Sequence, residues 1–105
     1  MNIAWATGLF EGEGCIYKDP RCNSYRLTIN STDKDVLQRF LSVVGVGRII
    51  EGKHVKRNRH HKPFWIWHTH RKEEVKALLS LMLPFLGERR GYTALNALDV
   101  LDGVY

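Results

Sequence analysis

Apolar and polar positions change from a helical to a strand spacing within the first third of the chain. The helical spacing is set by Ile3, Ala6, Leu9 and Phe10. Segments 15–18 and 24–30 instead show the alternation of a strand, in which successive side chains point to opposite faces. Residues 19–21, which include a proline, form a turn between the two segments. The pattern therefore predicts a helix over residues 3–12 followed by a β-hairpin.

A second helix is predicted after the hairpin, over residues 33–44. Ser31 or Thr32 can cap its start, and Gly45 and Gly47 end it. One side of this helix is apolar and is expected to face the core through Val36, Leu37, Phe40, Leu41 and Val44.

A second hairpin and two further helices complete the pattern. Strands are predicted over residues 48–55 and 63–69, joined by a run of basic residues. A third helix is predicted over residues 73–83 and stops at a proline, and a fourth follows over residues 88–101. The inward side of the fourth helix is expected to consist of Tyr92, Leu95, Leu98 and Leu101.

The order helix, hairpin, helix, hairpin, helix belongs to the α+β class, with a four-stranded antiparallel sheet and helices on one of its faces. We expect one domain over residues 1–105. Strand parity assigns to the core-facing side Ile16, Tyr25, Leu27, Ile29, Ile49, Trp65 and Trp67. It assigns to the open side Tyr17, Arg26, Thr28, Arg48, Ile50, His54, Ile66 and His68. A broad, basic sheet surface of this kind can enter a DNA major groove; the alternative is a sheet face that contacts only water.

Composition and charge narrow the class of protein. The chain has 105 residues, 44% apolar and 26% charged, which indicates one folded domain rather than a disordered segment. Sixteen Lys and Arg against eleven Asp and Glu give a net charge of +5, which favours an anionic partner such as nucleic acid. Its apolar runs are shorter than the ~20 residues of a membrane span, so no membrane partner is expected.

The cysteines and the start of the chain bear on the cellular compartment. Cys15 and Cys22 lack Cys-x-x-Cys spacing, so reduced thiols are favoured over a disulfide. Glu11 and Glu13 stand where a secretory signal needs small neutral residues. We expect a cytoplasmic protein.

Two carboxylates alternate with glycines where the first helix ends. Glu11 and Glu13 lie at the helix end that carries partial negative charge, an unfavourable place for an acid unless a cation compensates. Carboxylates are ligands that Mg²⁺ prefers, so a metal site is one interpretation and exposed turn residues are the other. Gly8 and Gly12 each cost about 1 kcal/mol relative to alanine inside a helix, which suggests close approach of another helix.

The sequence of residues 5–14, WATGLFEGEG, resembles the signature of the LAGLIDADG homing endonucleases. The resemblance extends over nearly the whole chain, through segments 32–37, 44–49, 65–67 and 83–86. The predicted element order is the αββαββα core of that family. The resemblance therefore implies an enzyme that hydrolyses double-stranded DNA at a specific sequence.

The resemblance also implies roles for individual residues. Glu13 would bind a divalent metal together with the carbonyl of Gly12, although aspartate is commoner than glutamate here in the family. Arg89 would lie near the scissile phosphate and stabilise its developing charge. The family places a polar residue that positions the attacking water at the end of the second strand. The register puts Ile29 at that place, and its neighbour Asn30 is the candidate for the role. The expected metal is Mg²⁺, with Mn²⁺ as a substitute and Ca²⁺ supporting DNA binding only.

The signature occurs once, whereas each active site of the family uses acids from two signature helices. This implies a homodimer on a near-palindromic DNA site, with an interface formed by Trp5, Gly8, Leu9, Glu11 and Gly12. Guanine contacts are expected from Arg26 and Arg48. Phosphate contacts are expected from Lys53, Lys56, Arg57 and Arg59. The remaining candidates for DNA contact are Tyr17, Thr28, His54, Ile66 and His68.

Two other functions stay open beside the homing endonuclease. A DNA- or RNA-binding protein that does not cut, such as a maturase or a repressor, is compatible with glutamate at position 13 and with the lack of a glutamine-like water positioner. Zinc binding is suggested by His54, His60, His61, His68 and His70, but no cysteine pair lies close in sequence to complete a tetrahedral site. No small-molecule substrate is expected. Bound to DNA, the protein would be associated with the nucleoid; an organellar origin stays open.

Overall fold

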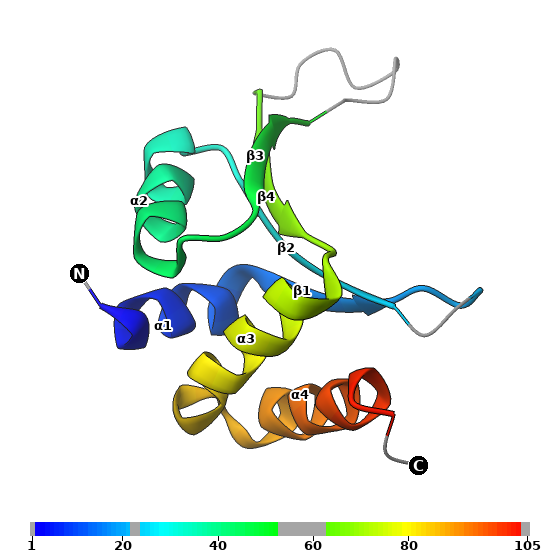
Figure 1. Ribbon diagram of the computed structural model, residues 1–105. Coiled ribbons are helices and arrows are strands. Elements are labelled where there is room, and N and C mark those ends of the chain that lie inside the picture. The colour runs from blue at the N-terminus through cyan, green and yellow to red at the C-terminus, as the bar shows by residue number, and fades with distance from the viewer. Residues whose placement is uncertain (1, 22–23, 53–62, 104–105) are drawn as a thin grey trace.

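The structure is a computed structural model that describes residues 2–21, 24–52 and 63–103 (Figure 1). Its elements in chain order are α1 (Ile3–Glu13), β1 (Gly14–Lys18), β2 (Tyr25–Ser31), α2 (Lys34–Val44), β3 (Arg48–Glu51), β4 (Trp65–Thr69), α3 (Lys72–Met82), the short 3₁₀ helix η1 (Leu83–Phe85) and α4 (Glu88–Leu101). This order confirms the predicted α+β layout. The residues of the predictions that lie outside the described ranges are Cys22, Lys53, His54, Lys56, Arg57, Arg59, His60 and His61.

The sheet has four antiparallel strands in the order β1-β2-β4-β3, so β1 and β3 form its edges. The register pairs Gly14 with Ile29 and Arg48 with His68. Helices α1 to α4 lie on one side of the sheet, and within the described part of the chain the other side is bare (Figure 1). The helices therefore cover one face only, as predicted.

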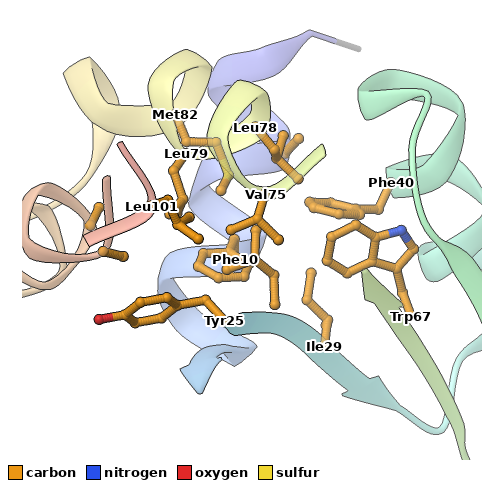
Figure 2. Close-up of a cluster of buried hydrophobic side chains, with 14 of the residues drawn as sticks. Phe10, Tyr25, Ile29, Phe40, Trp67, Val75, Leu78, Leu79, Met82 and Leu101 are labelled. Carbon is orange, nitrogen blue, oxygen red and sulfur yellow. The ribbon is translucent and has the colours of Figure 1, made fainter. Parts of the chain in front are cut away.

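The core lies between the helices and the sheet (Figure 2). Trp67 on β4 is fully buried and packs edge-to-face against Phe40 of α2, with ring centroids 4.7 Å apart. Its indole N–H donates a hydrogen bond of 2.9 Å to the carbonyl of Val46. Other large buried side chains are Phe10, Leu27, Ile29, Leu37, Leu78, Leu79 and Met82. Each contributes about 1.5–3 kcal/mol through burial, which orients the sheet toward the helices.

One side of α1 is buried against this core. The side chain of Asn2 caps the helix by accepting a hydrogen bond of 3.0 Å from the backbone N–H of Trp5. Ala6, Thr7 and Phe10 are buried, and the Thr7 hydroxyl donates to a carbonyl one turn earlier at 2.7 Å. The Thr7 hydroxyl is thus satisfied within the helix itself.

The start of α2 differs from the prediction. Asp33, rather than Ser31 or Thr32, is the N-cap residue, and its side chain makes no capping hydrogen bond. Ser31 belongs to β2 because the pairing with β4 continues to Ser31 and Trp65, and its hydroxyl accepts a hydrogen bond from the N–H of Asp33 at 3.0 Å. At the other end Gly45 has a φ of 73°, a left-handed conformation open to glycine, and ends α2 as predicted.

The inward side of α4 is the predicted one only in part: Leu101 is buried and Leu98 packs against the core, as expected. Tyr92 and Leu95 are 71% and 49% exposed, and the buried residues are Ala94, Ala97 and Leu101. The helix packs on α3 (Figure 1), and small alanine side chains let two helices approach closely. The contact with α3 therefore determines that the alanine side of α4 is buried. Helical spacing within α4 carries no information about this contact. No helix within the described residues is long and apolar enough to cross a membrane.

Candidate nucleic-acid interface and catalytic residues

The uncovered side of the sheet, here called the open face, carries its side chains in three rows set by the strand register. One row crosses all the strands and contains Cys15, Thr28, His68 and Arg48. A second contains Tyr17 and Arg26. A third contains Asn30, Ile66 and Ile50. These rows confirm the predicted strand parity; that the side chains contact DNA stays a prediction.

His68 lies in the middle of the open face. Burial, together with the positive charges of Arg26, Arg48 and His70, holds its pKa below the ordinary value of 6.5. The rings of His68 and His70 are stacked, with centroids 6.2 Å apart and planes at 12°. A neutral imidazole presents one hydrogen-bond donor and one acceptor. At neutral pH the open face therefore combines permanent cations with a neutral hydrogen-bonding group.

Two hollows open at this face. One of about 440 Å³ is lined by Cys15, Tyr17, Asp19, Pro20, Arg21, Arg26 and Thr28. The other, of about 260 Å³, is lined by Gly47, Arg48, His68, Thr69, His70, Arg71 and Glu74. In the second hollow the Thr69 hydroxyl donates a hydrogen bond of 2.6 Å to Glu74. Both hollows combine arginines with hydrogen-bonding groups, which are the features that recognise phosphates and base edges.

The predicted metal ligand and the predicted water-positioning residue border the same cavity. Glu13 is the exposed last residue of α1, and Asn30 is an exposed residue of β2, next to the Ile29 that pairs with Gly14. Both line a cavity of about 540 Å³ between α1, β2 and α2. The side chain of Ile29 is apolar and only 1% exposed, so Asn30 is its exposed polar neighbour. Asp33, which the sequence did not single out as a site residue, lines the cavity as well.

Glu11, in contrast, is tied to the start of α4. Its carboxylate accepts a hydrogen bond of 3.2 Å from the backbone N–H of Gly87 and lies 3.6 Å from Nε of Arg90. The same Nε donates to the Glu11 carbonyl at 3.0 Å, and the guanidinium lies 5.8 Å from the ring centroid of Phe10. Glu11 thus meets the positive end of α4, and Arg90 meets the negative end of α1. Arg90 is therefore the cation that compensates Glu11 within this chain.

This contact ties the end of α1 to the start of α4, and the place of Glu11 in a dimer interface stays a prediction. Sequence reasoning did not find the partnership with Arg90. The two residues are 79 positions apart, and no local spacing signals a contact at that separation.

Arg89 differs from its neighbour Arg90. It is exposed, and its side chain makes no hydrogen bond or ion pair with any described residue. It borders a hollow of about 310 Å³ together with Gly14, Cys15 and Thr93, directly beyond the end of α1. The resemblance assigns the phosphate contact to this unengaged arginine, and that role stays a prediction.

The outer side of α1 is smooth at its glycines. A Cβ atom added to Gly8 or Gly12 would meet nothing within 4 Å in this chain. Trp5 and Leu9 on the same helix are half-buried. Packing inside the chain therefore does not require these glycines, and the surface is open to close contact with another molecule.

The groups at the end of α1 fit a hard divalent cation. Glu13 offers an exposed carboxylate, and Gly12 offers a carbonyl of the last turn, where helical carbonyls lack partners in the helix. Mg²⁺ is commonly held by one or two carboxylates, waters and substrate phosphates. Within the described ranges no group of three or more His, Cys, Asp or Glu could hold a metal. One copy of the chain thus offers part of a Mg²⁺ donor set, and a zinc cluster is not found among these residues.

The structure is similar to many solved structures, among them three complexes with DNA. They are the homing endonuclease I-CvuI with its target in the presence of Ca (TM-score 0.71, 16% identity, 97% of this chain covered), the archaeal intron-encoded homing endonuclease I-Vdi141I (0.71, 16%, 97%) and the LAGLIDADG meganuclease I-AabMI bound to uncleaved DNA (0.74, 18%, 98%). The fold of this chain is therefore that of the LAGLIDADG homing endonucleases.

The chain spans 66% of the length of I-CvuI, 67% of I-Vdi141I and 38% of I-AabMI. No protein-family model and no curated protein matches its sequence. The three neighbours share the fold of this chain at 16–18% sequence identity. The similarity is thus found by comparing structures and not by comparing sequences.

Proposed function

We propose that this protein is a metal-dependent endonuclease that recognises a specific sequence of double-stranded DNA and cuts it as a homodimer. One observation carries the proposal: an exposed carboxylate, Glu13, and an exposed amide, Asn30, border one cavity at the edge of a basic open face. The fold, shared with homing endonucleases solved in complex with DNA, supports it.

DNA lies along the open face in this proposal. Arg26 and Arg48 contact guanine edges in the major groove, which admits a two-stranded β-ribbon. The basic residues that follow β3 in the sequence, Lys53, Lys56, Arg57 and Arg59, bind phosphates. Because such contacts release counterions, affinity should fall steeply as salt concentration rises.

Cleavage requires a water oxygen to attack phosphorus while the bond to the leaving oxygen breaks. Asn30 orients that water by a hydrogen bond, and Arg89, which is always charged, stabilises negative charge on the phosphate. Glu13 and the Gly12 carbonyl would hold Mg²⁺, and a bound Mg²⁺ would supply a lowered pKa of water and stabilisation of charge on the phosphate oxygens. Mn²⁺ accepts similar ligands and should substitute, and Ca²⁺ should support binding without cleavage.

A second copy of the chain completes the site in this proposal. Each copy supplies one exposed carboxylate at the end of α1, and the smooth surface at Gly8 and Gly12 permits two α1 helices to pack closely. Two-fold symmetry of the dimer would favour a near-palindromic DNA site.

The variant Glu13→Gln tests the metal assignment, because it removes the charge and keeps the shape of the side chain. Wild type and variant are incubated with a randomised double-stranded DNA library in Mg²⁺ and in Ca²⁺, and cut ends and bound fragments are sequenced. We expect the variant to bind the same DNA as wild type. Loss of a residue that only supports a metal ligand typically lowers activity by ~10–100-fold. Because Glu13 is proposed as a ligand itself, the rate of cutting by the variant should fall by more than this.

The matched control is Glu73→Gln, an exposed acid in the first turn of α3, which should keep full cutting. Normal cutting by Glu13→Gln would refute the role of Glu13. Binding without cutting by wild type in both metals would refute the nuclease and favour a binding protein on the same fold. Repeating the selection with an RNA library would then identify which nucleic acid it binds.

A further inference from the structure

Two isoleucines interrupt the polar surface of the open face. Ile50 on β3 is 44% exposed, and Ile66 on β4 lies directly opposite in the register and is half-buried. Opposite residues of antiparallel strands have Cβ atoms about 4.5–5.5 Å apart, so the two side chains form one apolar patch. Helices α1 to α4 pack on the other side of the sheet (Figure 1), so none of these helices covers the patch.

Polar groups border this isoleucine patch on two sides. Asn30 pairs with Ile66 on the β2 side, and Arg48 pairs with His68 in the next row of the same two strands. Two residues of a strand advance about 6.6 Å, and base pairs in DNA follow each other every ~3.4 Å. A surface that places Arg48 against one base pair therefore places the isoleucine patch about two base pairs away in the same groove.

We propose that Ile50 and Ile66 recognise the C5-methyl group of thymine and so select a T·A pair in each half of the DNA site. This inference rests on the proposed function and adds residues that determine specificity. Thymine is the base that presents a methyl group in the major groove, and apolar contact with it is a direct form of base recognition. Isoleucine side chains cannot form hydrogen bonds with the polar edges of the other bases. Burying those polar edges against the two isoleucines is therefore unfavourable.

Deoxyuridine in place of thymine tests the inference on the unaltered protein, because the change removes the methyl group alone. A DNA site is first selected from a randomised double-stranded library in Ca²⁺. Each thymine of the selected site is then replaced in turn, in both half-sites together, and Kd is measured by fluorescence anisotropy. At the recognised position we expect about fourfold weaker binding for each methyl group lost, or roughly 16-fold for the symmetric replacement.

A restored methyl group provides the converse measurement. At the recognised position, C·G should bind more weakly than T·A, and 5-methylcytosine paired with guanine should bind more tightly than unmodified C·G. The two C·G pairs, with and without the methyl group, present the same hydrogen-bonding edges. The difference in Kd between them therefore measures the contribution of the methyl group.

Variants locate the contact on the protein. Ile50→Ala and Ile66→Ala should bind the thymine and deoxyuridine sites with nearly equal Kd, and Ile66→Val, which keeps an apolar contact, should preserve most of the discrimination. Leu95→Ala is the matched control, since Leu95 is 49% exposed on α4, away from the open face, and should discriminate like wild type.

The outcomes separate this inference from the proposed function. If no DNA is selected, the proposed function is wrong and the inference with it. If DNA is selected but contains no thymine, or if no thymine responds to deoxyuridine, the inference alone is overturned and the isoleucines serve only as a cross-strand pair. Unchanged discrimination in a folded Ile50→Ala would overturn it as well.

Discussion

His68 shows how a single residue on the open face is tuned by its neighbours. It is half-buried in β4, pairs with Arg48 on one side and Thr28 on the other, and stacks on His70. Burial and the surrounding positive charges disfavour its protonated form and hold its pKa below 6.5. The neutral ring limits the repulsion among cations that are gathered for an anionic partner.

This lowered pKa predicts a loss of stability in mild acid. In the window between the lowered pKa of folded His68 and 6.5, the unfolded chain binds more protons, so the free energy of unfolding rises with pH. The contribution is present above about 6.5 and is lost as pH falls through the folded pKa. The free energy of unfolding is measured by urea denaturation at pH 7.5 and at pH 5.0. We expect it to differ less between the two pH values for His68→Gln than for wild type.

Arg26→Gln provides a check on the cause, because it removes one of the charges that lower the pKa of His68. This variant should also have a weaker pH dependence between those two values. An identical pH dependence in wild type and both variants would exclude His68 as the origin of the effect.

At the scale of elements, the contact between α1 and α4 holds the candidate catalytic groups in place. Glu11 and Arg90 join the end of the helix that carries Glu13 to the start of the helix that carries Arg89. Each charged group contacts the end of the other helix, whose dipole favours its charge. On each helix an engaged charged residue thus lies within two positions of an exposed one: Glu11 beside Glu13, and Arg90 beside Arg89.

Arg90→Ala and Arg89→Ala should separate these two roles. Arg90→Ala removes a charge-assisted hydrogen bond and the partner of a partly exposed carboxylate, so we expect a loss of about 1–2 kcal/mol in the free energy of unfolding. Arg89→Ala should change it by less than about 0.5 kcal/mol, because Arg89 is an exposed side chain. Urea denaturation measures both, and equal destabilisation by the two variants would contradict this division.

At the scale of the whole molecule, the helices cover one face of the sheet and leave the open face bare (Figure 1), and the outer side of α1 is exposed at Gly8 and Gly12. The first suits an anionic partner and the second a second copy of the chain. A dimer would bring together two ends of α1, each with its Glu13, which is why self-association and cutting are expected to be lost together.

Gly8→Leu tests the association. The added side chain enters open space in the single chain and should leave its stability unchanged or raise it by about 0.5–1 kcal/mol, since glycine is unfavourable inside a helix. It should prevent close packing of two α1 helices, so light scattering should give a monomer mass where wild type gives a dimer.

Gly91→Leu is the matched control, because Gly91 is a helical glycine of α4 whose added Cβ also meets nothing within 4 Å. It should remain dimeric. A dimeric Gly8→Leu, or a wild type that stays monomeric with and without DNA, would refute the proposed interface.

The sequence alone determined the elements and the faces of the sheet. Helical spacing and strand alternation are local properties, and the sides on which Arg26, Arg48 and Ile66 lie follow from alternation once the strands are known. The signature at residues 5–14 likewise lies in one continuous segment, so the fold resemblance was visible before any packing was known.

Tertiary structure decided what depends on contacts between distant segments. Packing on α3 chose Ala94 and Ala97 over Tyr92 as the buried side of α4, although both sides have helical spacing. Folding also brought Arg90 to Glu11, which left Arg89 unengaged, and placed Asn30 beside Glu13 at one cavity. Local sequence patterns specify which side chains can face inward. Only the packing of helices and strands against one another determines which residues they contact.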